Sequence, residues 1–345
     1  MMSKRVTIKD VAEDAHVSLA TASFALNNVK GRVSEEVRLR VLKSAEKLHY
    51  TSNTSARSLR TNDTRTVMFV YSREYLMERN ASYMTFLSGC VEYADRTGKG
   101  ILLELIDTEA PLEEQVEKFK RIWASQRVNG IIFQCYFEDE RDDVLYRILY
   151  QSGINLVNIS RIGNSTGYPC VYLEEFQFAR DQVRFAVDKG YKKLYYLCKK
   201  HRKPGIREEG FLDEVNGRGI HGEIIHYPTI YRTEDELWNL VKPLIADSQE
   251  RTAILCWNDV DAISLMNALK KNGISIPEQV GVMGFDNIPL SEYVVPKLTT
   301  VSQPFEEMSR HALEILERAD KRSPDAEPVI EHIKVFGEII DRESM

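Results

Sequence analysis

The hydrophobic positions of the first 26 residues recur at the period of an α-helix. The apolar face of a first helix consists of Ile8, Val11, Ala12 and Ala15. Thr7 and Asp10 have the spacing of a capping box at its start, and the helix is expected to end near His16 and Val17. Ser18 is a second N-cap. The buried stripe of the second helix that follows consists of Ala22, Ala25 and Leu26.

The second predicted helix has a free face. The residues pointing away from its buried stripe are Leu19, Ala20, Ser23 and Phe24. Two short helices, a tight turn and a free face on the second helix are the arrangement with which a helix-turn-helix presents a recognition helix to the DNA major groove. A helical hairpin within a larger fold has the same pattern, so the pattern alone leaves both interpretations open.

A third helix and a polar segment complete the N-terminal region. Ser34 caps this helix, and Glu35 and Glu36 occupy its first turn, where the helix dipole favours acids. Its apolar stripe is Val37, Val41, Ala45 and Leu48, and its basic side chains off the stripe, within reach of phosphates, are Arg38, Arg40, Lys43 and Lys47. Segment 51–64 is polar with one large apolar residue, Leu59. It is either a linker or a short helix that forms only on a partner.

From residue 66 the pattern changes to short apolar runs that alternate with amphipathic segments. The predicted strands are 67–71, 101–106, 130–137, 156–159, 170–173, 194–198, 223–227, 253–257 and 280–285. Helices between them end at Gly98, Gly153, Gly190 and Gly273. Such alternation predicts an α/β fold with parallel sheets. About ten strands exceed one compact sheet, so we expect two α/β lobes with a cleft between them, and ligands bind beyond the carboxyl ends of such strands.

Composition excludes several classes of protein. The chain has 345 residues, 43% of them hydrophobic and 28% charged, which suits two or three globular domains. It has no apolar run of the roughly 20 residues that span a bilayer and no apolar signal core, so we expect a cytoplasmic protein without a membrane partner. Its five cysteines are widely spaced in apolar segments. They are interpreted as buried thiols rather than a disulfide framework or a metal site, and no cofactor is expected.

Charge is unevenly distributed along the chain. Residues 1–65 carry 12 Lys and Arg against 7 Asp and Glu, a net charge of +5. Since the whole chain has a net charge of −6, the remainder carries −11. A basic N-terminal segment on an acidic body fits an appended nucleic-acid-binding module.

A set of short motifs now identifies a family. The N-terminal motifs are T-I-K-D-V-A (7–12), V-S-x-A-T (17–21), N-N (27–28), V-S-E-E-V-R (33–38) and H-Y-T-S-N-T-S-A-R-S-L-R (49–60). The later motifs are R-E-E-G-F (207–211), W-N-D-V-D-A (257–262), G-V-M-G-F-D-N (281–287), P-K-L-T-T-V-S-Q-P (296–304) and I-I-D-R-E-S (339–344). In this order the chain resembles the lactose/galactose repressor (LacI/GalR) family. The resemblance implies a dimeric transcription regulator with a two-lobed core similar to periplasmic sugar-binding proteins.

The resemblance also implies a domain plan. Residues 1–50 form an all-α helix-turn-helix DNA-binding domain, 51–64 a hinge, and 65–345 a ligand-binding and dimerisation core. The chain crosses between the lobes three times. We expect the first lobe to contain about 65–162 and 294–324, and the second about 163–293 and 325–345.

In the family, residues at the start of the recognition helix contact base edges, and the hinge helix inserts a leucine into the minor groove. Carried over to this chain, the DNA-binding residues are Thr7, Ser18, Leu19, Ala20, Thr21, Ser23, Phe24, Asn28, Tyr50, Asn53, Ala56, Arg57 and Leu59. Leu59 is the residue expected to wedge between base pairs. The expected partner is double-stranded, pseudo-palindromic operator DNA.

The chain departs from the family pattern at several positions. Phe24 stands where the family commonly has a polar or basic residue, and it can pack on thymine methyl groups but cannot make a bidentate contact to guanine. The alternative is that Phe24 turns inward to pack, because exposed large aromatic side chains are uncommon. His16 replaces a glycine in the inter-helix turn, where a positive φ is costlier without glycine. Ser52 replaces a proline before the hinge, and segment 72–81 replaces a shorter, less charged loop.

Polar residues at strand ends are candidates for a small-molecule site. Supported by the family pattern, the ligand-binding candidates are Asn80, Tyr83, Arg161, Arg207, Trp257, Asn258 and Asp286. Asn, Asp and Arg offer the paired donors and acceptors that match vicinal hydroxyls, and an aromatic ring completes a sugar site. The expected effector is therefore a sugar or a sugar derivative. Asp259 is interpreted as a helix N-cap. For Asp286, the alternative to ligand binding is that its side chain only stabilises a turn.

Two other classes of protein share the α/β pattern of this chain. A transport-type sugar-binding protein is disfavoured by the missing signal sequence and the basic N-terminal module. A sugar- or nucleoside-processing enzyme is disfavoured because no catalytic motif is present, and G-R-G-I-H-G (217–222) follows a helix, the wrong context for a dinucleotide fingerprint. We therefore expect no enzyme activity. The chain ends soon after its last motif, without the heptad extension of tetrameric relatives, so a homodimer is expected.

Overall fold

The protein is described by a computed structural model. It describes residues 6–27, 29, 31–50, 64–73, 81–135, 141–160, 167–200, 205–227, 233–246, 250–322 and 329–345, without the side chains at 81, 82 and 160. The chain divides into two compact units, residues 1–64 and 65–345. No helix among these residues is both long and apolar enough to cross a membrane.

The first unit is a three-helix bundle of α1 (Ile8–Asp14), α2 (Leu19–Leu26) and α3 (Glu35–Lys47). All three predicted N-caps are confirmed: Thr7 forms a capping box with Asp10, and the hydroxyls of Ser18 and Ser34 accept backbone N–H groups of the first turn. Its core consists of Val11, Ala12, Ala15, Ala22, Ala25, Val41 and Ala45. His16 has φ 52° in the turn between α1 and α2, the left-handed conformation expected there.

The second unit contains two six-stranded sheets. The first has the order β11-β5-β4-β3-β1-β2 and the second the order β12-β10-β9-β8-β6-β7. The strands of the first are β1 (Thr66–Ser72), β2 (Gly100–Ile106), β3 (Gly130–Gln134), β4 (Leu156–Ser160), β5 (Cys170–Leu173) and β11 (His332–Val335). Those of the second are β6 (Lys193–Lys199), β7 (His221–Tyr227), β8 (Thr252–Cys256), β9 (Val280–Asp286), β10 (Thr299–Ser302) and β12 (Glu338–Ile340). Among the described residues, all strand pairings are parallel except the antiparallel pair of β10 and β12.

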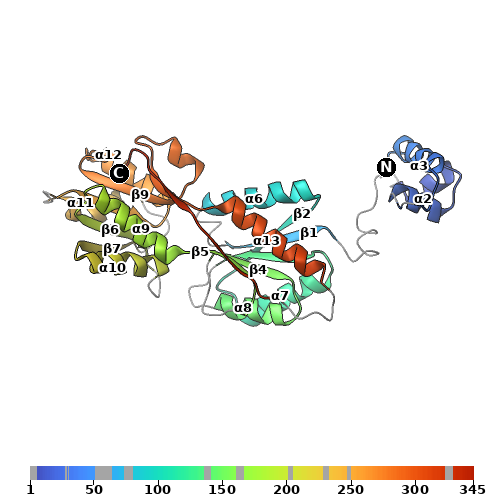
Figure 1. Ribbon diagram of the computed structural model, residues 1–345, viewed down its shortest axis with the longest axis horizontal. Coiled ribbons are helices and arrows are strands. Elements are labelled where there is room, and N and C mark those ends of the chain that lie inside the picture. The colour runs from blue at the N-terminus through green and yellow to red at the C-terminus, as the bar shows by residue number, and fades with distance from the viewer. Residues whose placement is uncertain are drawn as a thin grey trace. The chain divides into compact units, whose positions relative to one another are not determined.

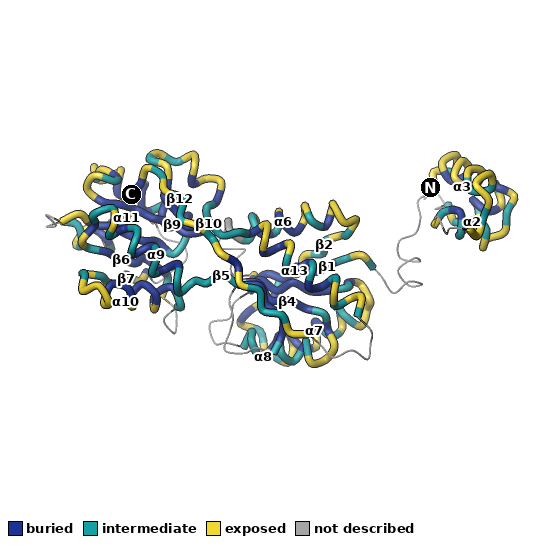
Figure 2. The backbone as a smooth tube through the Cα atoms, in the orientation of Figure 1, coloured by how far each residue is buried: buried dark blue, intermediate teal, exposed yellow. Residues whose placement is uncertain are grey.

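Helices cover both faces of each sheet (Figure 1). The first sheet, with α6 (Ala81–Thr97), α7 (Leu112–Ala124), α8 (Arg141–Gln151) and α13 (Phe305–Asp320), forms the first lobe. The second sheet, with α9 (Glu175–Asp188), α10 (Ile206–Arg218), α11 (Glu234–Ile245), α12 (Asp259–Lys271) and the 3₁₀ turn η1 (Pro289–Glu292), forms the second lobe. The sheets are accordingly buried along most of their length (Figure 2).

The predicted alternation of strands and helices is confirmed. Each of the nine predicted strands corresponds to a strand of the structure, and all four predicted helix-terminal glycines have positive φ. All five cysteines are free and buried, as expected. Sequence periodicity missed β10, β11 and β12, because each has only three or four residues and shows no long apolar run.

The expected lobe boundaries need correction at three strands. β5 and β11 lie in the first sheet, although 163–293 and 325–345 were assigned to the second lobe. β10 lies in the second sheet, although 294–324 was assigned to the first. The physical reason is that each crossing follows a strand that is still paired in the sheet the chain is leaving, as β5 is with β4 and β10 with β9. The chain still crosses three times, as the resemblance implied: after β5, after β10 and after β11.

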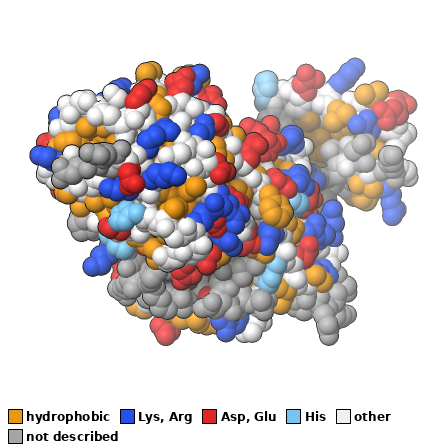
Figure 3. All heavy atoms as spheres, turned by 60° about the vertical axis from the view of Figure 1, so that its left-hand side comes forward, with side chains coloured by type: hydrophobic (Ala, Val, Ile, Leu, Met, Phe, Trp, Pro, Cys, Tyr) orange, Lys and Arg blue, Asp and Glu red, His pale blue; other side chains and the backbone are white. Residues whose placement is uncertain are grey.

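The surface of the second lobe is mixed in charge. On the face that Figure 3 shows, acidic and basic side chains lie next to one another. The ion pairs of this lobe include those of Arg180 and Arg184 of α9 with the buried Glu214 of α10. The negative charge of this unit is thus partly neutralised locally.

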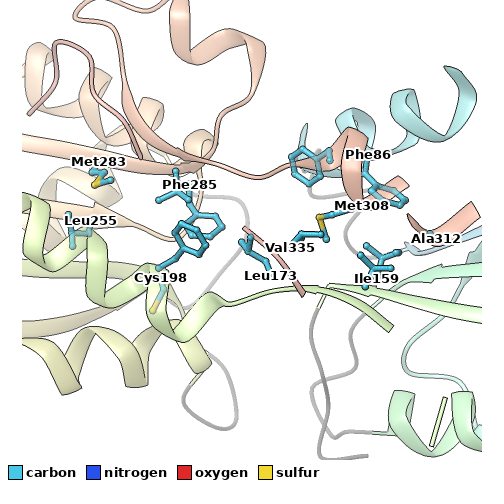
Figure 4. Packing of buried hydrophobic residues seen from close by; sticks show 14 of the residues in the cluster. Phe86, Ile159, Leu173, Cys198, Leu255, Met283, Phe285, Met308, Ala312 and Val335 are labelled. Atoms are coloured by element: carbon cyan, nitrogen blue, oxygen red, sulfur yellow. The ribbon is translucent and has the colours of Figure 1, made fainter. Parts of the chain in front are cut away.

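One apolar cluster extends through both lobes. It includes Phe86, Ile159 and Met308 in the first lobe and Leu255, Met283 and Phe285 in the second, with Leu173 and Val335 between them (Figure 4). Leu173 and Val335 come from the last residues of β5 and β11, the strands that precede two of the crossings. The crossing segments therefore belong to the same core as the lobes that they join.

Candidate functional site

The first candidate site is the exposed start of α2. Leu19 is 53% exposed and Ala20 is also exposed, so both lie on the surface as predicted. The hydroxyl of Ser18 accepts the backbone N–H of Thr21 and lies 2.8 Å from the Thr21 hydroxyl. These two hydroxyls order the first turn. At the amino end of α2, the apolar side chains of Leu19 and Ala20 therefore face solvent next to the hydroxyl groups of Ser18 and Thr21.

Phe24 is only half exposed, and the guanidinium of Arg32 lies 5.8 Å from its ring centroid. The aromatic ring is therefore partly covered, which lies between the two alternatives of an outward-pointing ring and one packed into the bundle. Ser23 is likewise half exposed. Arg32 was missed by sequence reasoning, because it lies in the turn before α3 and no helical period connects it to α2.

The other predicted DNA-binding residues have mixed positions. Thr7 is exposed at the start of α1, and Tyr50 packs against the core after α3. Five of the predicted residues lie outside the described part of the chain: Asn28, Asn53, Ala56, Arg57 and Leu59. The hinge prediction thus stays a prediction.

The second candidate site is centred on Arg207, in the first turn of α10. Its guanidinium lies 3.9 Å from the ring centroid of Trp257 and 4.2 Å from that of Phe285, so it is held between two aromatic rings. Its Nη1 donates a hydrogen bond to the Trp257 carbonyl at 2.7 Å, and Glu175 is an ion-pair partner at 3.7 Å. Arg207 Nε is buried with no acceptor in the described parts of the chain. The Glu175 carboxylate faces this same nitrogen at 3.7 Å, which is beyond hydrogen-bond distance.

Asp286 ends β9 next to this arginine. It is buried and has φ 120°, a conformation that side chains rarely adopt. Burial and the nearby carboxylate of Asp259 raise its pKa well above the ordinary value, and Arg207 partly offsets them. Gln303 donates a hydrogen bond to its Oδ1. Asp286 and Arg207 therefore place a carboxyl group and a guanidinium in electrostatic contact at the end of β9.

The N-cap of α12 differs from the prediction. Asn258 caps this helix by accepting the backbone N–H of Asp261 at 2.8 Å, so the interpretation of Asp259 as the cap was wrong. Asp259 is the first helical residue. It is fully buried and accepts the backbone N–H of Ile288 and the hydroxyl of Thr300. Burial raises its pKa to about 6.

The structure brings together some of the predicted ligand residues. Arg207 and Trp257 are in contact, Arg207 and Asp286 interact electrostatically, and Asn258 follows Trp257 in the chain. Tyr83 lies in the first lobe, where its ring stacks 5.5 Å from that of Tyr71. Asn80 and Arg161 lie outside the described residues.

A pocket of about 550 Å³ extends beside Asp286 toward the first lobe. Its lining includes Thr85 of α6, Asp286, Asn287 and Gln303. A ligand in it can touch both lobes, which is the requirement for a ligand that changes their spacing. Phe285, Gln303 and Glu175 are additional site residues. Phe285 and Gln303 lie in two of the family motifs, at 281–287 and 296–304, whereas Glu175 lies in none of them.

Two family models match the chain. The model for bacterial regulatory proteins of the lacI family matches residues 7–53, and the model for a periplasmic binding protein-like domain matches residues 183–345. The first match covers the three-helix unit, and the second covers most of the second lobe.

Relatives match over most of the chain. The HTH-type transcriptional repressor PurR of Vibrio vulnificus is 31% identical over 90% of this chain and 90% of its own. The HTH-type transcriptional regulator GalS of Salmonella typhimurium is 30% identical over 90% of this chain and 88% of its own. Among solved structures, the lac repressor dimer bound to operator and the anti-inducer ONPF has a TM-score of 0.79 at 19% identity and covers 99% of both chains. The structure titled transcriptional regulator CelR-cellobiose complex has a TM-score of 0.65 at 20% identity and covers 99% of this chain and 100% of that chain.

Proposed function

Because the chain belongs to the lacI family of bacterial regulatory proteins, we propose that it is a transcriptional repressor that binds operator DNA through α2 and a small effector between its core lobes. Its relatives are regulators rather than enzymes. The observation that carries the proposal is the exposed amino end of α2. Leu19, its first residue, faces solvent, while Ser18 caps the helix and Ala22 and Ala25 pack in the core. We propose that it acts in the cytoplasm and that it is a homodimer, because two identical subunits match the two half-sites of a pseudo-palindromic operator.

We infer that the effector is a carbohydrate or a derivative of one. Arg207 and Asp286 supply the paired donors and acceptors that hydroxyl groups need, and the Trp257 ring supplies an apolar surface. The pocket beside Asp286 holds about 550 Å³, a volume that suits a small ligand. Two of the similar solved structures are complexes with small molecules: CelR is bound to cellobiose, and the lac repressor is bound to operator and the anti-inducer ONPF.

The proposal is tested by selecting duplexes from a random DNA pool with the purified full-length protein. We expect enrichment of a pseudo-palindrome that binds at least about 10³-fold more tightly than random duplex DNA at physiological salt. Equal affinity for selected and random duplexes argues against a sequence-specific regulator.

The effector is sought by a thermal-shift screen of sugars, sugar phosphates and nucleobases. A bound ligand raises the melting temperature because it stabilises the state that it binds. We expect a carbohydrate to raise it and, by linkage, to change operator affinity by about fivefold or more. A nucleobase as the only ligand found contradicts the inferred effector class but leaves the DNA-binding function intact.

A further inference from the structure

Three side chains that the proposed function does not use meet in the second lobe. Cys198 lies near the end of β6, His226 near the end of β7, and Glu208 in the first turn of α10. Glu208 Oε1 is 3.4 Å from Cys198 Sγ and 2.7 Å from His226 Nε2. All three candidate ligand atoms lie within 4.8 Å of one another.

The βαβ unit explains why residues so far apart in the sequence come together. Cys198 and His226 are directly paired across the parallel strands β6 and β7, so their side chains leave the same face of the sheet. Helix α10 connects these two strands and contacts both. Its first turn therefore brings Glu208 to the carboxyl ends of the pair.

The Glu208 carboxylate has a fixed orientation. Its Oε2 accepts the backbone N–H of Gly205, the N-cap residue of α10, which leaves Oε1 directed at Cys198 and His226. The Glu208 side chain is only 2% exposed, whereas that of His226 is 39% exposed. The cluster is thus rigid at its carboxylate and reachable from solvent at its imidazole.

We propose that Cys198, Glu208 and His226 bind a thiophilic divalent cation, Zn²⁺ in the first instance, with a fourth coordination position on the open side of His226. Thiolate, imidazole and carboxylate are the ligands of zinc, and its bond lengths place tetrahedral ligand atoms roughly 3.3–3.6 Å apart. The cysteine–glutamate distance of 3.4 Å already meets this value. The histidine–glutamate distance of 2.7 Å opens by less than about one ångström when a metal replaces the hydrogen bond.

Proton balance gives the site a measurable pH dependence. Burial, first of all, and the nearby Glu208 carboxylate raise the pKa of the Cys198 thiol. Binding of Zn²⁺ forms the sulfur–zinc bond and releases one proton to solvent, and the thiolate and carboxylate then neutralise the cation. Affinity therefore falls as pH falls. Cys198 belongs to the second-lobe part of the apolar cluster shown in Figure 4 and is buried.

The test uses untagged, chelator-treated full-length protein with Co²⁺ as a spectroscopic probe and Zn²⁺ as competitor. We expect one Co²⁺ per chain with a near-ultraviolet thiolate-to-cobalt band, and loss of that band when Zn²⁺ is added. Cys198→Ser removes the band, and Glu208→Gln and His226→Ala each weaken Zn²⁺ binding by about tenfold or more. Circular dichroism without metal checks that each variant is folded.

Matched controls are Cys170→Ser, a buried thiol in the first sheet, and His221→Ala at the opposite end of β7. Both are expected to keep the band and the Zn²⁺ affinity. The proposal is overturned if the wild type shows no thiolate band, if the band persists in Cys198→Ser, or if Glu208→Gln and His226→Ala bind Zn²⁺ as the wild type does. None of these results bears on operator binding, so the site and the proposed function are tested separately.

Discussion

At the scale of single residues, the buried charges of the second lobe are held by specific partners. Glu214 of α10 is 5% exposed and meets Arg180, Arg184 and Arg218 at 2.8, 2.9 and 2.6 Å. Hydrogen bonding, first of all from Arg184, lowers its pKa to about 2. Because α9 and α10 pack along each other, this carboxylate joins the two helices electrostatically.

Replacing Glu214 by Gln is expected to destabilise the core. A carboxylate whose folded pKa is lowered contributes stability that is complete above its unfolded pKa of about 4.5 and is lost as the pH falls toward 2. The arginines are partly exposed, so solvent screening reduces the loss at pH 7 to roughly 1–2 kcal/mol. Urea unfolding at pH 7 and pH 3 measures it. The difference between wild type and variant should shrink at pH 3, and an unchanged difference contradicts the assignment.

Replacing Arg207 by Lys is expected to raise the dissociation constant for the effector by about tenfold or more, because an ammonium group stacks poorly between two rings. Affinity for operator without effector should stay unchanged. Isothermal titration with the effector found by the screen measures the change. Arg251→Lys is the matched control, because Arg251 lies over the Tyr191 ring near the start of β8, at the other end of the sheet. Equal losses in both variants contradict a ligand role for Arg207.

At the scale of elements, the turn between α1 and α2 holds a histidine in a strained conformation. His16 has φ 52° and an exposed side chain, and the left-handed region costs an L-residue about 1–2 kcal/mol relative to glycine. The neighbouring caps determine this geometry, because α1 ends at Asp14 and Ser18 already caps α2.

His16→Gly is therefore expected to stabilise the helical unit by about 0.5–1 kcal/mol. Hydrogen exchange of the α1–α3 amides in the full-length protein measures this as slower exchange. Lys9→Gly, an exposed substitution inside α1, should have the opposite effect, since glycine destabilises a helix interior. Faster amide exchange in His16→Gly contradicts the interpretation that His16 is strained.

The apolar surface of α2 predicts an operator that depends on A·T pairs. Leu19 and Ala20 are exposed and Phe24 half exposed, and apolar groups contact thymine methyls rather than guanine acceptors. Systematic base substitution of the selected operator is expected to show losses of about 1–3 kcal/mol at A·T positions facing α2. A dominant requirement for guanine at those positions contradicts this prediction.

At the scale of the whole molecule, the proposed function needs coupling between the core and the DNA-binding unit. A ligand that binds one arrangement of the lobes more tightly changes operator affinity by the same free energy with which operator changes ligand affinity. The pocket beside Asp286, lined from both lobes, is where such a difference can arise.

Leu59→Ala tests the proposed connection. Leu59 lies outside the described residues, and the prediction rests on its place in the hinge motif of the family. Loss of the wedge is expected to weaken specific operator binding far more than binding to random duplexes, because only the specific complex holds kinked DNA. Filter binding or gel shift on both DNAs measures the two losses. An equal loss on both contradicts the wedge.

The sequence by itself determined the elements of this protein. Thr7, Ser18 and Ser34 cap their helices as predicted, and the nine apolar runs became strands, because capping and hydrophobic period act over a few neighbouring residues. The ordered motifs determined the family. Short strands β10, β11 and β12 escaped prediction because their strand character depends on the sheets that they join.

Only the tertiary structure decided which distant side chains meet. It placed Arg207 between Trp257 and Phe285, and it made Asn258 rather than Asp259 the cap of α12. It also brought Cys198 and His226 side by side through the register of β6 and β7. These contacts depend on strand register and helix packing, which are set by the whole core and leave no local pattern in the sequence.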